Sequence, residues 1–191
     1  MTDEKNILCI EDYIEFIVAQ KNLSKNTCES YFSDLKQFVE FIKNKPLVSI
    51  NDSSVKEYLH LLSNNFSPSS HARKLSTLKQ FYDFLVNEKK IDKNPFINSD
   101  FPKSEKRLPS ILSENEMNMI FEYSYKDSSN YGLRFIAMIE IMYATGIRVS
   151  ELVNLKVSSF REDFSSILVK GKGKKERYVP ITDKAMVATE K

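Results

Sequence analysis

Arg148 stands in the segment YATGIRVSEL, which covers residues 143–152. A helical pattern ends at Gly146, and the arginine begins the next short helical pattern in apolar surroundings. A guanidinium held in this way can bind a phosphate or a carboxylate through two parallel hydrogen bonds. The spacing also fits a structural ion pair between Arg148 and Glu151, and Glu151 could equally orient the arginine toward a ligand. From spacing alone, the ion pair is the favoured interpretation.

A second group of cations lies in the segment KGKGKKER, residues 170–177, where five of the eight residues are Lys or Arg. Gly171 and Gly173 flank Lys172, so the backbone there can approach a ligand closely. A lysine in this place can contact a phosphate or donate a proton to a leaving alkoxide. The two glycines are one residue apart and a strand follows, which excludes a P-loop. A solvated basic turn is the other interpretation of the same residues.

The elements that must hold these two segments follow from the apolar spacing in the second half of the chain. Ser113 and Glu116 have the spacing of a capping box and open one helix. Residues 130–144 are apolar on nearly every side, which predicts a buried helix. The elements predicted after it are a short helix, two antiparallel strands and a last helix, over residues 149–155, 166–169, 178–181 and from about 183.

Four amphipathic helix patterns fill the first half of the chain. Ser24 is the predicted N-cap of the second, and Asp52 or Ser53 that of the third. Pro68 lies near the first turn of the fourth, a position that proline tolerates. After residue 91 the periodicity stops, and prolines mark a segment rich in Asn, Ser and Lys. We therefore expect a four-helix domain, a linker and a second domain, over residues 1–91, 92–110 and 111–191.

The composition is that of a globular protein, with 41% hydrophobic and 28% charged residues in a chain of 191. No apolar run approaches the ~20 residues that span a bilayer, and no signal-peptide pattern opens the chain, so we expect a cytoplasmic protein with no membrane partner. The net charge of +2 is unevenly distributed. Residues 67–110 contain nine Lys and Arg and five Asp and Glu. Residues 166–191 contain seven Lys and Arg and three Asp and Glu. Two such basic segments favour a polyanionic partner, although a solvated surface has the same pattern.

Together, the two cationic segments resemble the tyrosine recombinase (phage integrase) family, most closely its bacterial Xer-type members. The family's first catalytic arginine lies in an A-T-G-x-R-x-S-E-L box, matched by residues 144–152. Its catalytic lysine lies in a G-K-G-x-K-E-R-x-V-P hairpin, matched by residues 171–180. The resemblance covers essentially the whole chain and implies a mainly α fold. An N-terminal four-helix SAM-like core-binding domain would precede the start of an α+β catalytic domain with a small antiparallel sheet.

By this resemblance, Arg148 would stabilise the non-bridging oxygens of a scissile phosphate, and Lys172 would protonate the departing 5′ oxygen. The family attacks the phosphate with a tyrosine and uses no metal ion or nucleotide, so no cofactor is expected. The implied partners are double-stranded DNA and other recombinase protomers. DNA contacts are expected from the second and fourth helices, at Lys25, Asn26, Thr27, Ser70, His71, Arg73, Lys74 and Lys79.

The sequence departs from the family's pattern after the hairpin. It contains no H-x-x-R box, no later His or Trp and no tyrosine beyond the hairpin, and Tyr143 and Tyr178 are interpreted as core residues. We therefore expect that this chain alone does not cleave DNA. The implied parent function is site-specific recombination, as in phage integration or resolution of chromosome dimers. The alternatives are a DNA-binding module without catalysis, a non-functional remnant with exposed apolar surface, and a helical interaction protein with no nucleic-acid role.

Overall fold

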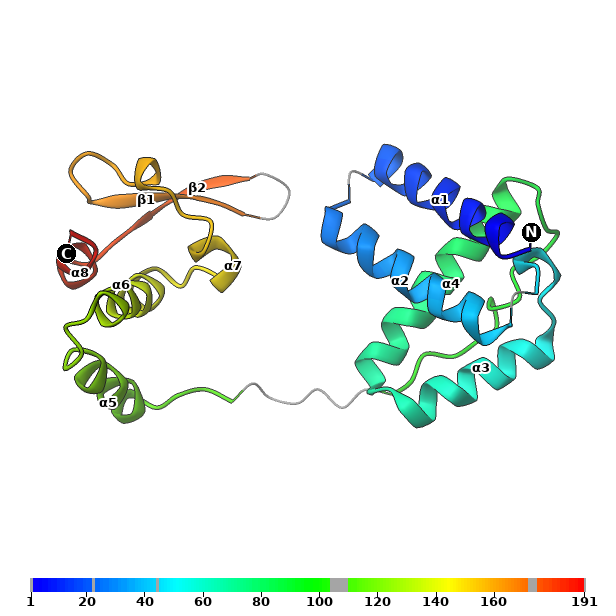
Figure 1. Cartoon of the computed structure of the whole chain (residues 1–191), viewed down its shortest axis with the longest axis horizontal. Helices are drawn as coiled ribbons and strands as arrows, with labels where there is room; N and C mark the ends of the chain where they lie inside the picture. Colours follow the sequence, from blue (N-terminus) through cyan, green and yellow to red (C-terminus); the bar gives the residue numbers. More distant parts are fainter. Residues whose placement is uncertain (1, 22, 44, 104–109, 172–174, 191) are drawn as a thin grey trace. The chain divides into compact units, whose positions relative to one another are not determined.

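The chain folds as two compact units, Met1–Arg107 and Leu108–Lys191. The structure is a computed structural model, and it describes residues 2–21, 23–43, 45–103, 110–171 and 175–190. In these residues the fold is mainly α with one two-stranded antiparallel sheet (Figure 1), which confirms the predicted fold class. Within the same ranges, no helix is both long and apolar enough to cross a membrane.

Among the described residues of the first unit, four α-helices are present, as the sequence predicts (Figure 1). They are α1 (Thr2–Lys21), α2 (Lys25–Phe41), α3 (Asp52–Asn65) and α4 (Pro68–Asn87), and a short 3₁₀ helix, η1 (Leu47–Ser49), lies between α2 and α3. Ser24 caps α2, where its hydroxyl accepts a hydrogen bond from the backbone N–H of Thr27. Ser67 caps α4 in the same way, and Pro68 follows it in the first turn, where its missing N–H costs nothing.

The predicted cap of α3 is wrong by one residue. Asn51 is the N-cap instead of Asp52 or Ser53, and its Oδ1 accepts a hydrogen bond from the backbone N–H of Ser54 at 3.0 Å. Asn51 has an extended backbone (φ −106°, ψ 169°), which is the conformation that turns a cap side chain back toward the helix end. Asp52 already lies in the first helical turn, where its negative charge favours the positive end of the helix dipole.

Aromatic rings fill the core of the first unit. Phe38 of α2 meets Tyr58 of α3 edge to face, with ring centroids 4.8 Å apart. Phe96, in the segment predicted as a linker, is fully buried and packs on Phe38 and on Tyr82 of α4, with centroid distances of 5.6 and 5.3 Å. The Asn94 amide donates to a backbone carbonyl of α4 at 3.0 Å. The chain after α4 therefore packs with the first unit at least as far as Phe96.

The second unit combines helices with a β-hairpin (Figure 1). Its helices are α5 (Glu114–Ser124), α6 (Asn130–Thr145), α7 (Val149–Leu152), the 3₁₀ helix η2 (Val157–Ser159) and α8 (Asp183–Glu190). Its strands are β1 (Ser166–Lys170) and β2 (Glu176–Pro180), paired with Ser166 opposite Pro180 and Lys170 opposite Glu176. The predicted capping box of Ser113 and Glu116 is present at the start of α5. The short helix ends three residues earlier than predicted, because the chain turns after Leu152.

The helix predicted over residues 130–144 is present as α6, but the prediction that it is buried is wrong for part of its surface. Ile141 is buried, but Tyr131 and Phe135 are 84% and 50% exposed. The described elements with the most contacts to α6 are α5, α7, α8 and β2, and these side chains remain exposed beside them. The interpretation of Tyr143 and Tyr178 as core residues is also wrong, because their side chains are 63% and 59% exposed.

Candidate functional site

Arg148 lies at the N-cap position of α7, directly after the turn that ends α6. Gly146 makes this turn in a left-handed conformation (φ 61°, ψ 21°), and its N–H donates to the carbonyl of Met142 at 2.9 Å. Glycine adopts this conformation without the strain that a Cβ would introduce. Ile147 is buried and anchors the turn, whereas the next side chain, Arg148, is 74% exposed. The turn thus directs the arginine into solvent.

A buried carboxylate holds Arg148 at its base. The Glu151 side chain is 6% exposed, and its Oε2 accepts the backbone N–H of Arg148 at 2.8 Å. Its Oε1 lies 3.3 Å from Nη1 of the same arginine. The ion pair predicted from the spacing is therefore present, and Glu151 also fixes the backbone from which the exposed guanidinium projects.

Arg177 of β2 approaches the same carboxylate from the hairpin. Its Nη1 and Nη2 donate to Oε1 and Oε2 of Glu151, both at 3.0 Å, which is a bidentate pair. The hydrogen bonds from Arg177, and then from the backbone of Arg148, lower the pKa of the Glu151 carboxyl to about 2. Glu151 therefore joins the arginine segment to the basic hairpin, although the two arginine-bearing segments are separate elements of the chain.

Lys172 lies outside the described residues, so its predicted contact with a phosphate stays a prediction. The glycine before it is described: Gly171 donates its N–H to the carbonyl of Lys175 at 2.8 Å. Gly171 also lies against the ion pair of Glu151 and Arg177. A Cβ at this position would stand 3.2 Å from Nη1 of Arg177 and 3.5 Å from Oε1 of Glu151. The hairpin thus packs closely on Glu151 where it leads to Lys172.

Three predicted DNA contacts lie at the N-terminus of α2. Lys25 and Asn26 are exposed, and the Lys25 ammonium is 3.8 Å from Glu29, a surface pair of the kind that contributes little to stability. Thr27 is half-buried, and its hydroxyl lies 2.8 Å from that of the cap residue Ser24. The backbone N–H groups at the start of a helix add partial positive charge here. This end of α2 presents one cation and several hydrogen-bond donors.

Ser70 and Lys79 of α4 are both engaged within the first unit. The Ser70 hydroxyl lies 3.1 Å from that of the cap residue Ser67. The Lys79 ammonium donates to the carbonyl of Ile97 at 3.2 Å and lies 5.0 Å from the centroid of the Phe101 ring. A phosphate contact by Lys79 would therefore have to compete with these two interactions.

The remaining three predicted contacts, His71, Arg73 and Lys74, lie in the first half of α4. His71 and Lys74 are each only 7% exposed, which argues against the direct DNA contacts predicted for them. Burial lowers the pKa of His71 below its ordinary value of 6.5 and so favours the neutral ring. The Lys74 ammonium lies 2.9 Å from Oδ1 of Asp34 in α2. Arg73 contacts the other oxygen of Asp34, but its side chain is 47% exposed and remains accessible to a ligand.

Asp34 and Arg177 hold these cationic segments, although neither is among the residues predicted to contact a phosphate. Asp34 precedes Leu35 and lies one turn before Phe38, on the apolar face of α2. A lone acid on a buried face is a signal that a cation must reach it, because buried carboxylates need partners. Arg177 has no such signal of burial: it is one of five cations in a basic segment, and only its fixed place in the G-K-G-x-K-E-R-x-V-P motif distinguishes it.

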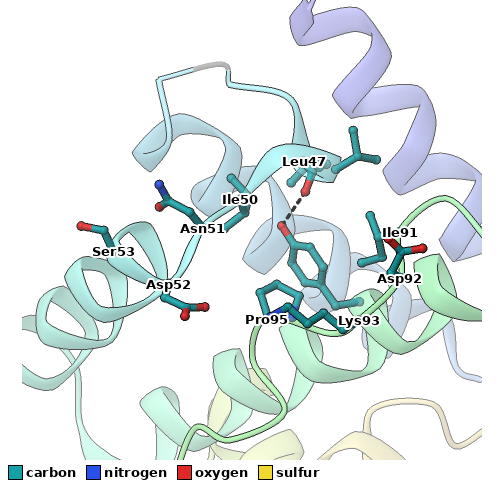
Figure 2. A pocket seen from close by; sticks show the side chains of 11 residues that line it. Leu47, Ile50, Asn51, Asp52, Ser53, Ile91, Asp92, Lys93 and Pro95 are labelled. Atoms are coloured by element: carbon teal, nitrogen blue, oxygen red, sulfur yellow. Dashed lines mark hydrogen bonds between the residues drawn. The ribbon is translucent and has the colours of Figure 1, made fainter.

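An open pocket of about 770 Å³ lies between η1, the start of α3 and the segment after α4 (Figure 2). The Tyr82 hydroxyl donates to the carbonyl of Leu47 at 3.0 Å beside it, and Asn51 and Asp52 contribute polar lining (Figure 2). Most residues that line the pocket come from the segments that follow α2 and α4 in the chain. These two helices contain 17 and 20 residues. Helices of that length separate their ends by roughly 25–30 Å. The pocket is therefore distinct from the N-terminal ends of α2 and α4, whereas the predicted DNA contact Lys79 lies in the second half of α4.

Two family profiles match the chain. One is described as the phage integrase N-terminal SAM-like domain and covers residues 10–89, and the other as the phage integrase family and covers residues 110–191. The chain is 37% identical over 189 residues to "Tyrosine recombinase XerD" of Rickettsia prowazekii, covering 94% of this chain and 61% of that protein. It is 38% identical over 183 residues to "Tyrosine recombinase XerC" of Anoxybacillus flavithermus, with the same two coverages. The chain thus spans about 61% of the length of these curated relatives.

A solved structure shows the likeness of the fold. A lambda integrase dimer bound to a COC' core site matches with a TM-score of 0.71 at 24% identity, covering 90% of this chain and 47% of that chain. This match confirms the predicted fold class.

Proposed function

Because the chain belongs to the tyrosine recombinase (phage integrase) family, we propose that it binds double-stranded DNA and serves site-specific DNA recombination. The observation that carries the proposal is the Glu151 carboxylate, which holds both Arg148 and the basic hairpin through Arg177. Two cationic segments therefore converge, as a site for one phosphate requires. DNA binding is proposed for the chain itself. Strand cleavage and rejoining are proposed for a protein that carries these two segments together with a nucleophilic tyrosine.

In the proposed reaction, the exposed Arg148 guanidinium donates hydrogen bonds to the non-bridging oxygens of the scissile phosphate. These bonds offset the negative charge that develops there in the transition state. The deprotonated oxygen of a tyrosine attacks the phosphorus, the bond from phosphorus to the 5′ oxygen breaks, and Lys172 donates a proton to that oxygen. The resulting 3′-phosphotyrosyl bond conserves the energy needed for rejoining. The nine tyrosines of this chain include none to which we assign the attack.

The first unit supplies the proposed grip on DNA. Lys25 and Asn26 at the start of α2 and Arg73 in α4 are exposed donors, and a helix N-terminus itself favours phosphate. Contacts to phosphates give affinity without sequence preference, whereas polar side chains in a groove read base edges. The partners proposed are double-stranded DNA and further recombinase protomers. A protein that binds cellular DNA acts where that DNA is, so the cytoplasm remains part of this proposal.

Binding of the 191-residue chain to a random-sequence duplex across a salt series tests the proposal. We expect the logarithm of the binding constant to fall linearly with the logarithm of salt concentration, because each contacted phosphate releases counterions. Lys25→Ala should reduce that slope by about 1. Lys56→Ala, which removes an exposed lysine of α3 outside the predicted contacts, is the matched control and should leave the slope unchanged. A folded chain that binds no DNA contradicts the proposal.

A second arm tests the reaction in a full-length recombinase that carries this sequence. Arg148→Ala should abolish strand cleavage and leave binding of the same duplex nearly intact, because the arginine acts on the scissile phosphate. If the variant instead loses binding with no specific defect in cleavage, the role assigned to Arg148 is wrong.

A further inference from the structure

A buried carboxylate joins the two helices that carry the predicted DNA contacts. Asp34 of α2 is 2% exposed and is surrounded by donors from α4. The Lys74 ammonium lies 2.9 Å from Oδ1, the Thr77 hydroxyl lies 3.3 Å from Oδ2, and Nη1 of Arg73 also contacts Oδ2. A carboxylate so deeply buried requires such partners, because desolvation otherwise penalises its charged form.

The two cations around Asp34 have different surroundings. The Lys74 side chain is 8% exposed, and its ammonium also contacts Oε1 of Gln37 and lies 4.8 Å from the centroid of the Phe66 ring. Lys74 is therefore an internal counter-charge. The Arg73 side chain is 47% exposed, and its contact with Asp34 uses one of its terminal nitrogens. A guanidinium has five N–H donors in a rigid fork, so the exposed part of the group still has donors to offer.

The charges of this cluster do not cancel. Two cations and one carboxylate leave a net charge of +1, and the accessible part of that charge lies on Arg73. Lys74 balances Asp34 from inside the unit, so the buried carboxylate does not repel an anion that approaches Arg73. The cluster therefore presents one oriented cation at the surface between α2 and α4.

We propose that Asp34 is a positioning residue for DNA binding, which holds the Arg73 guanidinium in one orientation so that its exposed donors meet a DNA phosphate. This inference rests on the proposed function, since it takes duplex DNA as the ligand. An arginine that binds a phosphate loses side-chain freedom, and this loss weakens binding. Asp34 restricts Arg73 before DNA arrives, which removes part of that loss.

A charge-matched variant separates positioning from net charge. Asp34→Asn with Lys74→Met removes both internal charges and leaves the cluster at +1, carried by Arg73. Asparagine and methionine are close in size to the residues that they replace, and methionine retains apolar contact with Phe66. Binding to a random-sequence duplex would be measured across a salt series for the parent, Arg73→Ala, the double variant and the triple variant that combines them.

We expect Arg73→Ala to bind about eightfold more weakly at about 0.1 M salt, which is the effect of losing one phosphate contact, and the double variant to bind more weakly than the parent by at most that factor. The triple variant should bind like Arg73→Ala, because Asp34 acts only through Arg73. If the double variant binds like the parent, or if the losses add in the triple variant, the proposal is overturned. If Arg73→Ala binds like the parent, it is also overturned. A folded parent chain that does not bind the duplex would instead refute the proposed function, and this inference with it.

Circular dichroism would show whether the double variant folds. A second measurement needs only the parent chain: side-chain nitrogen NMR of the arginines in the absence of DNA. The guanidinium of Arg73 should be restricted in motion, whereas that of exposed Arg134 in α6 should move freely. Equal mobility of the two groups would overturn the proposal, because Asp34 would then hold nothing in place.

Discussion

At the scale of single residues, Glu151 links stability to pH in the second unit. Its folded-state pKa of about 2 lies below the ordinary value of 4.5, so the unfolded chain binds this proton first as the pH falls. The stabilisation from the ionised carboxylate is therefore complete above pH 4.5 and is lost as the pH falls toward 2. Glu151→Gln should be less stable than the parent near neutral pH.

The measurement is thermal unfolding of the parent and Glu151→Gln between about pH 7 and pH 2.5. The difference between the unfolding temperatures of the two proteins should narrow below pH 4.5. The other acidic residues affect both proteins equally, so they do not contribute to this difference. A difference that stays constant over this range would show that the carboxylate gains nothing from ionisation in the fold.

Local motifs predict Arg148 and Lys172, but they do not predict what holds the site. Glu151 is three residues from Arg148, and that pair could be expected from spacing. The pair of Glu151 with Arg177 joins residues 26 apart, and that of Asp34 with Lys74 joins residues 40 apart. The packing of helices and strands decides which cation pairs with which acid over such a separation in sequence. A local sequence pattern therefore cannot predict these pairs. The same packing buries Lys74, which the sequence pattern presented as a surface cation.

At the scale of elements, helices follow from the sequence because their signals are local. Apolar periodicity and cap residues lie within one or two turns, and they correctly predict α2, α4 and α5. The exposed side of α6 was not predictable in this way. An apolar residue type indicates that a side chain is suited to a core. The side chain is buried only where another element packs on it. Tyr131 and Phe135 have the residue types of a core without such a cover.

The cap of α3 offers a direct test at this scale. Asn51→Ala removes the side chain that accepts from the backbone N–H of Ser54, and it should lower the free energy of unfolding by about 1 kcal/mol. Ser53→Ala is the matched control, since the Ser53 hydroxyl donates only to exposed Glu57 and its loss should cost a few tenths of a kcal/mol. Urea unfolding of the three proteins measures both effects. Equal losses would restore the original assignment of the cap.

At the scale of the whole molecule, the two units have cores of different kinds. The first contains fully buried rings, including Tyr13, Phe38, Tyr58, Phe81 and Phe96. In the described residues of the second unit, the buried hydrophobic side chains are aliphatic, namely Ile136, Ile141, Ile147, Leu152, Ile167, Val169, Ala185 and Ala188. Each buried aromatic ring removes about 150–250 Å² from water, and hydrophobic stabilisation grows with that area. The first unit therefore has more apolar burial with which to oppose conformational entropy.

We accordingly expect the second unit to unfold at a lower denaturant concentration than the first. Hydrogen exchange followed by mass spectrometry resolves the two, because peptides from α5 to α8 and peptides from α2 to α4 report separately. Protection should disappear first in the α5 to α8 peptides. Leu62→Ala, a substitution in the first core, should bring forward the loss of protection in the α2 to α4 peptides alone. A single transition shared by all peptides would mean that the two cores unfold as one cooperative structure, and the difference in their packing would then have no thermodynamic consequence.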